Sequence, residues 1–247
     1  KVLKYKHNNT ESLEDVLSDL PNDKIKVVIT DGVFSMEGDI APLPKIVEIA
    51  NKYGATVMVD DAHGLGVLGK NGCGTVNHFG LEGEVELIMG TFSKSLATVG
   101  GFIAGSKELI NYIKHNSRAL IFTASLTPAS VASVIEALNI IRDEPQRIDK
   151  LWENTNYAKK VLSEAGFDTG HSQTPVIPLY IRDDQKTFIF TQMLADDGVF
   201  VNPVISPAVK PEDSLIRFSL MATHEKHHID EAVEKCVIAA KKLGILK

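Results

Sequence analysis

Polar side chains directly follow three apolar, strand-like runs in the first half of the chain. The first group is Asp31 to Ser35, the second is Asp60 to His63, and the third is Thr91 to Lys94. In open α/β sheets, ligands collect beyond the carboxyl ends of parallel strands. These three groups are therefore the first candidates for a functional site.

Lys94 lies between two serines just after one of these runs. A lysine at the end of a core crevice usually needs a partner or a function. Desolvation there lowers the pKa of the amine and makes it a nucleophile for a carbonyl compound. The alternative is a surface lysine in a turn that begins a helix. The loop also resembles a nucleotide phosphate-binding loop, but the second glycine is absent. The hydroxyls of Thr91 and Ser93 remain candidates for holding one phosphate.

Asp60 and His63 are three residues apart where the chain leaves its strand. This spacing can present a carboxylate and an imidazole to the same ligand. A metal ion would need a third ligand of similar kind, and Asp61 alone is a poor candidate. We therefore predict no metal site here.

The elements that position these residues alternate between strand and helix. The run 25–30 predicts a buried strand, the apolar spacing of 42–53 predicts a helix that Gly54 ends, and 55–60 predicts a second strand. This βαβ order indicates a parallel sheet. An Ala-rich helix over 127–141 precedes a change of domain. Beyond it we expect a smaller α/β unit with helices at 146–165, 186–196 and 226–243 and strands at 176–181 and 215–220.

The composition excludes several classes of protein. The 247 residues are 44% hydrophobic, which suffices for a real core. The net charge is −6 and no stripe of Lys or Arg is present, so we expect no nucleic-acid partner. No apolar run reaches the roughly 20 residues of a spanning helix, although contact with a membrane surface stays open. The two distant cysteines, Cys73 and Cys236, suit a reducing cytoplasm, and a start at Lys1 indicates a fragment.

The three groups together resemble the α-oxoamine synthases, enzymes that use pyridoxal 5′-phosphate (PLP) to condense an amino acid with an acyl-CoA thioester. Val59 to His63 and Gly90 to Lys94 match the two motifs of that family, and the resemblance runs from Lys6 to the carboxyl terminus. It implies an α/β fold of type I, like that of aspartate aminotransferase. Residues 1–142 would be part of the large domain, with a mainly parallel sheet, and residues 143–247 the small domain.

The resemblance implies a role for each residue that touches the ring of PLP. Lys94 would carry the cofactor as a Schiff base, and Asp60 would keep the pyridine nitrogen protonated. His63 and Ser35 would both contact the phenolic oxygen. The histidine that stacks on the ring in this family lies upstream of the region covered, so the chain alone is expected to bind PLP weakly or not at all.

The resemblance also implies contacts to the phosphate and to the substrate. Thr91 and Ser93 would bind the phosphate, and Arg217 would grip the substrate carboxylate with its two-donor fork. Thr123 would reach the phosphate of the neighbouring subunit. That last contact implies a homodimer with shared active sites.

Local sequence favours one branch of the family. Residues 90–95, with Ser93 where many members have glycine, and the segments 31–39 and 217–224 favour enzymes that join L-serine to palmitoyl-CoA or a similar acyl-CoA. The alternatives are members that join glycine to acetyl-CoA or alanine to pimeloyl-CoA. A non-catalytic scaffold subunit is the alternative outside enzymes, and the presence of Lys94, Asp60 and His63 together argues against it.

Overall fold

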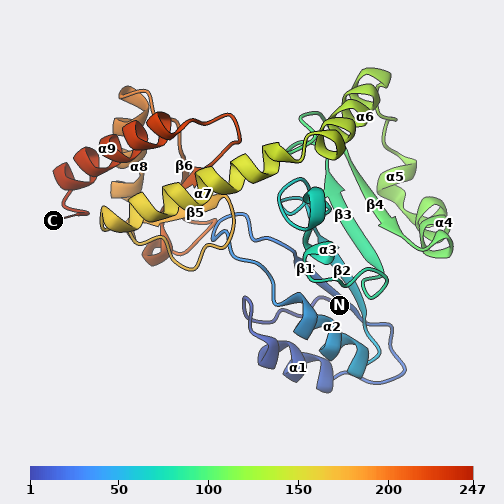
Figure 1. Ribbon diagram of the computed structural model, residues 1–247. Helices are drawn as coiled ribbons and strands as arrows, with labels where there is room; N and C mark the ends of the chain where they lie inside the picture. Colours follow the sequence, from blue (N-terminus) through green and yellow to red (C-terminus); the bar gives the residue numbers. More distant parts are fainter. Residues whose placement is uncertain (247) are drawn as a thin grey trace. The chain divides into compact units, whose positions relative to one another are not determined.

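The computed structural model describes residues 1–246, and the chain divides into two compact units (Figure 1). Unit 1 comprises residues 1–33 and 40–145. Unit 2 comprises Phe34–Asp39 together with the chain from Gln146 onward. The expected domains, 1–142 and 143–247, differ from these units mainly in the short segment 34–39, which a continuous boundary cannot assign to the second unit.

Unit 1 is built on a four-stranded sheet whose spatial order follows the chain. The first three strands are parallel and the fourth is antiparallel to the third, in agreement with the predicted mainly parallel sheet. The strands are β1 (Val27–Asp31), β2 (Thr56–Asp60), β3 (Leu87–Thr91) and β4 (Gly101–Gly105).

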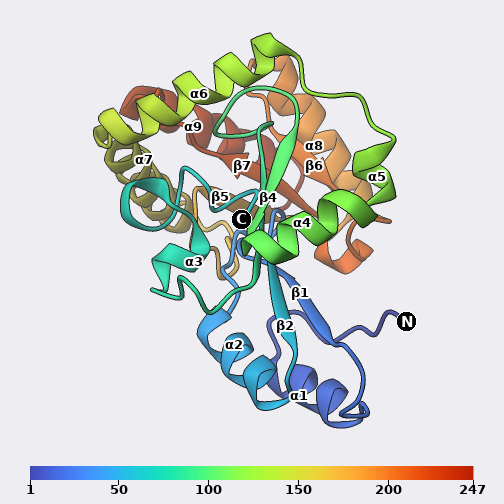
Figure 2. The ribbon, with the colours of Figure 1, turned by 90° about the vertical axis from the view of Figure 1, so that its right-hand side faces the viewer.

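Two amphipathic helices pack beside β1 and β2. The helix α1 (Thr10–Ser18) begins at Asn9, whose side chain accepts a hydrogen bond from the backbone N–H of Ser12. The helix α2 (Leu43–Lys52) connects β1 to β2 and ends before Gly54, which adopts a φ of +61°. Figures 1 and 2 both place α1 and α2 side by side below the two strands. Their buried leucines and isoleucines close one face of the sheet.

The short helices η1 (Lys70–Gly72) and α3 (Thr75–His78) follow β2 and bury Gly72, Thr75 and Val76. The later part of unit 1 is far less buried and contains α4 (Lys107–Asn116), α5 (Arg118–Ile121) and α6 (Pro128–Asp143). The helices α4 and α5 bury no residue, and α6 buries only Val134. This segment was predicted only in part, because α4 and α5 were not expected.

Unit 2 encloses its own core. An antiparallel sheet of order β5-β7-β6 packs against three helices, with Leu162, Phe190 and Ile216 fully buried among them. The elements are α7 (Gln146–Glu164), β5 (Val176–Tyr180), α8 (Asp184–Asp196), β6 (Asn202–Val204), η2 (Pro211–Asp213), β7 (Leu215–Ser219) and α9 (Lys226–Lys242).

Within residues 1–246, every helix is too short or too polar to cross a membrane. Both cysteines are free thiols; Cys73 is exposed, and Cys236 lies in the core of unit 2, where burial raises its pKa to about 12.

Candidate active site

The carboxyl ends of β1, β2 and β3 meet at one edge of the sheet in unit 1. Asp31 pairs with Asp60 in the parallel register, and Asp60 pairs with Met89, two residues before Thr91. Three of the predicted groups therefore begin at neighbouring strand ends, as expected for a ligand site in an open α/β sheet.

The loop that carries Lys94 is held by apolar anchors on both sides. Phe92 and Leu96 are buried and form a small cluster with Val134 of α6. The three residues between the anchors are exposed, Lys94 included. The expectation of a desolvated lysine is not met in this structure, because burial of the loop is achieved through Phe92 and Leu96 and leaves its middle facing outward. Lys94 is nonetheless displayed on a loop whose two ends are fixed.

Two hydroxyls lie directly beside the lysine. The Oγ atoms of Thr91 and Ser93 are 2.8 Å apart, and the backbone N–H of Ser93 donates to Thr91 Oγ1 at 3.3 Å. Gly90 precedes them with the ring of Phe102 so close that any Cβ would overlap it. Hydroxyls and backbone N–H groups clustered in this way can hold the oxygens of one phosphate.

The loop after β2 is organised by a carboxylate that the sequence analysis assigned no role. Asp61 is 3% exposed, and its two oxygens accept hydrogen bonds from the hydroxyl (2.6 Å) and the backbone N–H (2.7 Å) of Thr75. A Cβ at Gly64 or Gly74 would overlap this carboxylate. Burial raises the pKa of Asp61, partly opposed by the bonds from Thr75. The buried Asp61 carboxylate therefore stabilises the loop that contains Asp60 and His63.

Those neighbours are the two predicted cofactor contacts. Asp60 is half-buried, and its Oδ1 accepts the backbone N–H of Ala62 at 3.0 Å. His63 is also half-buried, two residues beyond Asp61. No cluster of three or more His, Cys, Asp or Glu suited to a metal ion occurs in residues 1–246.

The His63 loop and the Lys94 loop are joined directly. The hydroxyl of Ser95 donates to the backbone oxygen of Leu65 at 2.7 Å. A Cβ on Gly66 would lie 2.6 Å from the Cβ of Ser95, so glycine permits this close approach. The structure therefore brings Asp60, His63, Thr91, Ser93 and Lys94 together within unit 1.

Arg217 and Ser35 come together within unit 2. Arg217 lies in the middle of β7, and its Nη1 donates to the backbone oxygen of Ser35 at 3.2 Å. Its Nε is buried and has no hydrogen-bond partner among the described residues. A buried donor without a partner is costly and marks a place where a ligand oxygen would be stabilising.

Thr123 is separate from both groups in the sequence and in its surroundings. It lies in the exposed connection between α5 and α6, next to Phe122, which is 80% exposed. Thr123 itself is exposed within the described residues, and its role towards a neighbouring subunit stays a prediction.

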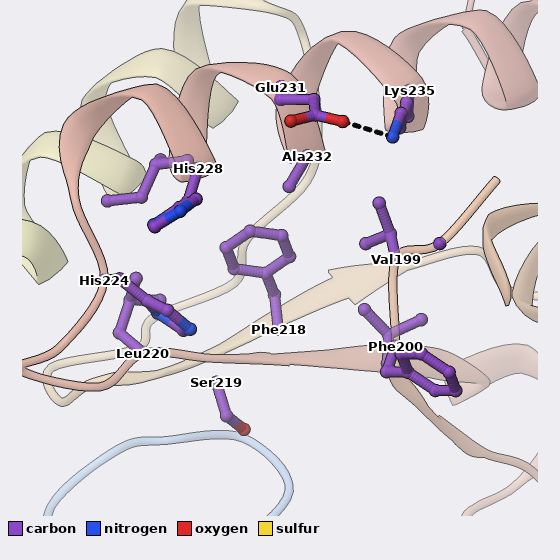
Figure 3. A pocket seen from close by; sticks show the side chains of 13 residues that line it. Val199, Phe200, Phe218, Ser219, Leu220, His224, His228, Glu231, Ala232 and Lys235 are labelled. Atoms are coloured by element: carbon purple, nitrogen blue, oxygen red, sulfur yellow. Dashed lines mark hydrogen bonds and ion pairs between the residues drawn. The ribbon is translucent and has the colours of Figure 1, made fainter.

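A cavity of about 330 Å³ in unit 2 contains none of the predicted site residues. Figure 3 shows His224 and His228 on one side of Phe218 and Val199 and Phe200 on the other. The Nδ1 atoms of His224 and His228 accept the backbone N–H groups of Met221 and Glu225 at 3.2 and 3.1 Å, so the two rings stabilise the turn before α9 and its N-cap.

The family model for aminotransferase class I and II matches residues 1–236. The chain belongs to the aminotransferase class I and II family. Members of this family are PLP-dependent, so the predicted cofactor class and the type I fold are confirmed. The carboxylate of Asp60, the hydroxyl pair and the amine of Lys94, gathered at one sheet edge, fit such a cofactor.

Known members of the aminotransferase class I and II family narrow the resemblance. A serine palmitoyltransferase from Sphingobacterium spiritivorum is 58% identical over 99% of this chain and 61% of its own length. An 8-amino-7-oxononanoate synthase from Thermosipho melanesiensis is 44% identical over 98% of this chain and 62% of its own. The chain thus spans about three fifths of these relatives.

A solved structure agrees with the fold. A serine palmitoyltransferase variant from S. paucimobilis with a bound PLP–myriocin aldimine matches with a TM-score of 0.94 and 34% identity. The match covers 98% of this chain and 61% of that one. The predicted resemblance to serine palmitoyltransferases is confirmed, and the roles of the individual site residues stay predictions.

Proposed function

We propose that the full-length protein joins L-serine to palmitoyl-CoA or a similar long-chain acyl-CoA. CoA and CO₂ leave, and the product is 3-ketodihydrosphingosine. The observation that carries this choice of substrates is the much higher identity to the serine palmitoyltransferase than to the 8-amino-7-oxononanoate synthase. The edge-of-sheet arrangement of Asp60, Thr91 and Lys94 supports the reaction class.

When bound, PLP supplies an aromatic ring that takes up electron density from the α-carbon of an amino acid. We assign Asp60 to the ring nitrogen, where a carboxylate holds a proton in place. His63 and Ser35 are assigned to the phenolic oxygen as hydrogen-bond donors. Thr91 and Ser93 are assigned to the phosphate, which their paired hydroxyls support.

Two cations are assigned to the reacting amino acid. Arg217 holds its carboxylate through a planar fork, which the buried and unpaired Nε supports. Lys94 holds the cofactor between turnovers and, once released from it, its neutral amine accepts the α-proton as general base. Both tasks are supported by the position of Lys94, which is exposed in the middle of a loop whose two ends are anchored by the buried side chains of Phe92 and Leu96.

The protein is proposed to act as a homodimer with shared active sites in the cytoplasm. Support for the dimer comes from exposed apolar side chains close to Thr123 in the sequence, namely Ile121, Phe122 and Leu126. Support for the cytoplasm comes from the free thiols at Cys73 and Cys236.

The test compares absorbance spectra of the full-length protein and its Lys94→Ala variant after addition of PLP. Wild type should show the visible band of lysine-bound PLP and shift it with L-serine more than with glycine or alanine. Lys94→Ala should lack the band, and Lys107→Ala, an exposed lysine of α4, should retain it.

Turnover then separates the rival functions. Faster turnover of glycine with acetyl-CoA, or of alanine with pimeloyl-CoA, than of serine with palmitoyl-CoA would replace the proposed substrates. A wild-type protein with no visible band, unchanged by Lys94→Ala, would instead indicate a non-catalytic scaffold subunit.

A further inference from the structure

The loop Phe34–Asp39 leaves a strand of unit 1 yet belongs to unit 2. It is closed on itself by two backbone hydrogen bonds, from Phe34 N to the oxygen of Asp39 at 3.0 Å and from Gly38 N to the oxygen of Phe34 at 2.9 Å. These two bonds connect the beginning of the loop to its end, so a contact that holds Gly38 also restrains the position of Phe34 and of Ser35 next to it.

One end of the loop is held by Gly38. Its backbone oxygen accepts hydrogen bonds from the hydroxyl of Thr174 and from the backbone N–H of Gln173, both at 2.9 Å. Gly38 has a φ of +69°, and any Cβ on it would overlap the backbone oxygen of Val176. Only glycine fits so close to the start of β5.

The Thr174 hydroxyl makes this hydrogen bond to Gly38 from a buried position. The residue is 1% exposed, and it lies two residues before β5. The strand β5 pairs with β7, which carries Arg217 opposite Pro178. The residue that holds the loop and the arginine that meets it are therefore parts of one sheet.

The other end of the loop meets the guanidinium. Ser35 offers its backbone oxygen to Arg217 Nη1, and this is the one hydrogen bond recorded for that side chain among residues 1–246. The orientation of the fork thus depends on where Ser35 lies. A sequence of contacts connects Thr174 to Gly38, the closed loop to Ser35, and Ser35 to Arg217.

We propose that Thr174 is a positioning residue for amino-acid binding: its hydroxyl fixes the loop Phe34–Asp39 so that Ser35 orients Arg217 toward the substrate carboxylate. The inference rests on the proposed function, in which Arg217 binds that carboxylate. Thr174 itself touches neither substrate nor cofactor.

Thr174→Val removes the hydroxyl with little change in volume, and Thr174→Ser keeps it. Thr187→Val is the matched control, because Thr187 is 0% exposed in the same unit and its hydroxyl donates locally, to the backbone oxygen of Asp183, the N-cap of α8, at 2.7 Å. In the full-length protein, Thr174→Val should raise KM for the amino acid about fivefold, the value of one hydrogen bond. KM for acyl-CoA should stay within about twofold, and Thr174→Ser and Thr187→Val should keep both KM values near wild type.

Equal effects of Thr174→Val and Thr187→Val on the amino-acid KM would overturn the inference, since both would then report only lost stability. Hydrogen exchange of the backbone amides of residues 34–39 provides a readout independent of turnover. Faster exchange in Thr174→Val than in Thr187→Val supports the role of the hydrogen bond from Thr174 to Gly38 in fixing the loop, even if the substrates prove different and the proposed function fails. Identical exchange in the two variants overturns that role.

Discussion

Unit 2 buries most of its large apolar side chains, whereas the segment from β4 to α6 exposes many of them. In unit 2, residues from α7, α8, α9 and the sheet enclose one core in which many side chains are fully buried. From β4 to α6, apolar side chains of comparable size face outward, and β1 likewise exposes Val27 and Ile29 on one face. Since parallel sheets are normally covered on both faces, unit 1 supplies only part of its own cover within the described residues. The core of unit 2 is closed by its own residues, whereas unit 1 leaves apolar surface exposed among the described residues.

The largest loss of stability is expected when a large side chain is removed from the core of unit 2. Phe190 is 0% exposed, so Phe190→Ala should lower the free energy of unfolding of the full-length protein by about 4 kcal/mol through lost burial and an unfilled cavity. Urea unfolding measures the change. A loss below about 1 kcal/mol would mean that this core is not closed.

Unit 1 also contains a fully internal feature, the Asp61 carboxylate. Asp61→Ala leaves the N–H and hydroxyl of Thr75 unpaired and should cost about 3 kcal/mol. Because burial raises the pKa of Asp61, the folded state binds this proton more tightly, and its contribution falls as pH rises through the ordinary carboxyl pKa toward the raised value. Asp61→Asn should remove that part of the pH dependence of urea unfolding, and an unchanged profile would contradict the assignment.

Association should govern the outward-facing segment. Phe122→Ser should weaken the proposed dimer at least tenfold, about 1.4 kcal/mol, because a large exposed ring next to Thr123 loses its contact with the second copy. Sedimentation at a series of concentrations measures this, with Phe200→Ser, a 90% exposed phenylalanine of unit 2, as the control. Equal dissociation constants for both variants would remove Phe122 from the interface.

The smallest effect is expected at the surface of unit 2. Arg182 lowers the pKa of Asp168 through a hydrogen bond at 2.6 Å, so the pair stabilises the fold above the ordinary carboxyl pKa and loses that contribution as pH falls. Both side chains are about half exposed, so Asp168→Asn should cost at most about 0.5 kcal/mol near pH 7. A cost several times larger in urea unfolding would show that surface pairs, too, contribute to the internal stability of this unit.

Much of the fold was predictable because its signals are local. The βαβ unit, its ending at Gly54 and the strand before Lys94 follow from apolar spacing and one glycine. The helices α1 and α4 were missed although Asn9 and Ser106 provide ordinary N-caps that could have revealed them. The strand β6 was missed because Pro203 argues against a strand, and the chain accommodates it at a sheet edge.

The candidate site likewise contains residues that could be predicted from local sequence and residues that could not. Lys94, Asp60 and His63 are recognisable because they stand at strand ends in a specific order. The role of Asp61 was not predictable, since its partner Thr75 is fourteen residues away and nothing in the spacing indicates the pairing. The tether from Thr174 to Gly38 spans 136 residues, and only the folded chain brings these two together.

The middle strand of the second sheet also sets an order in time. The strand β7 is the last of the three to be synthesised, yet β5 and β6 each pair only with it. During synthesis, β5 and β6 therefore have no strand to pair with until residues 215–219 have emerged from the ribosome. The segment 34–39 waits longer still, because the backbone oxygen of Ser35 meets an arginine made 182 residues later. If synthesis pauses before β7, the strands β5 and β6 stay unpaired. During such a pause the nascent chain is most exposed to chaperones and to misassembly.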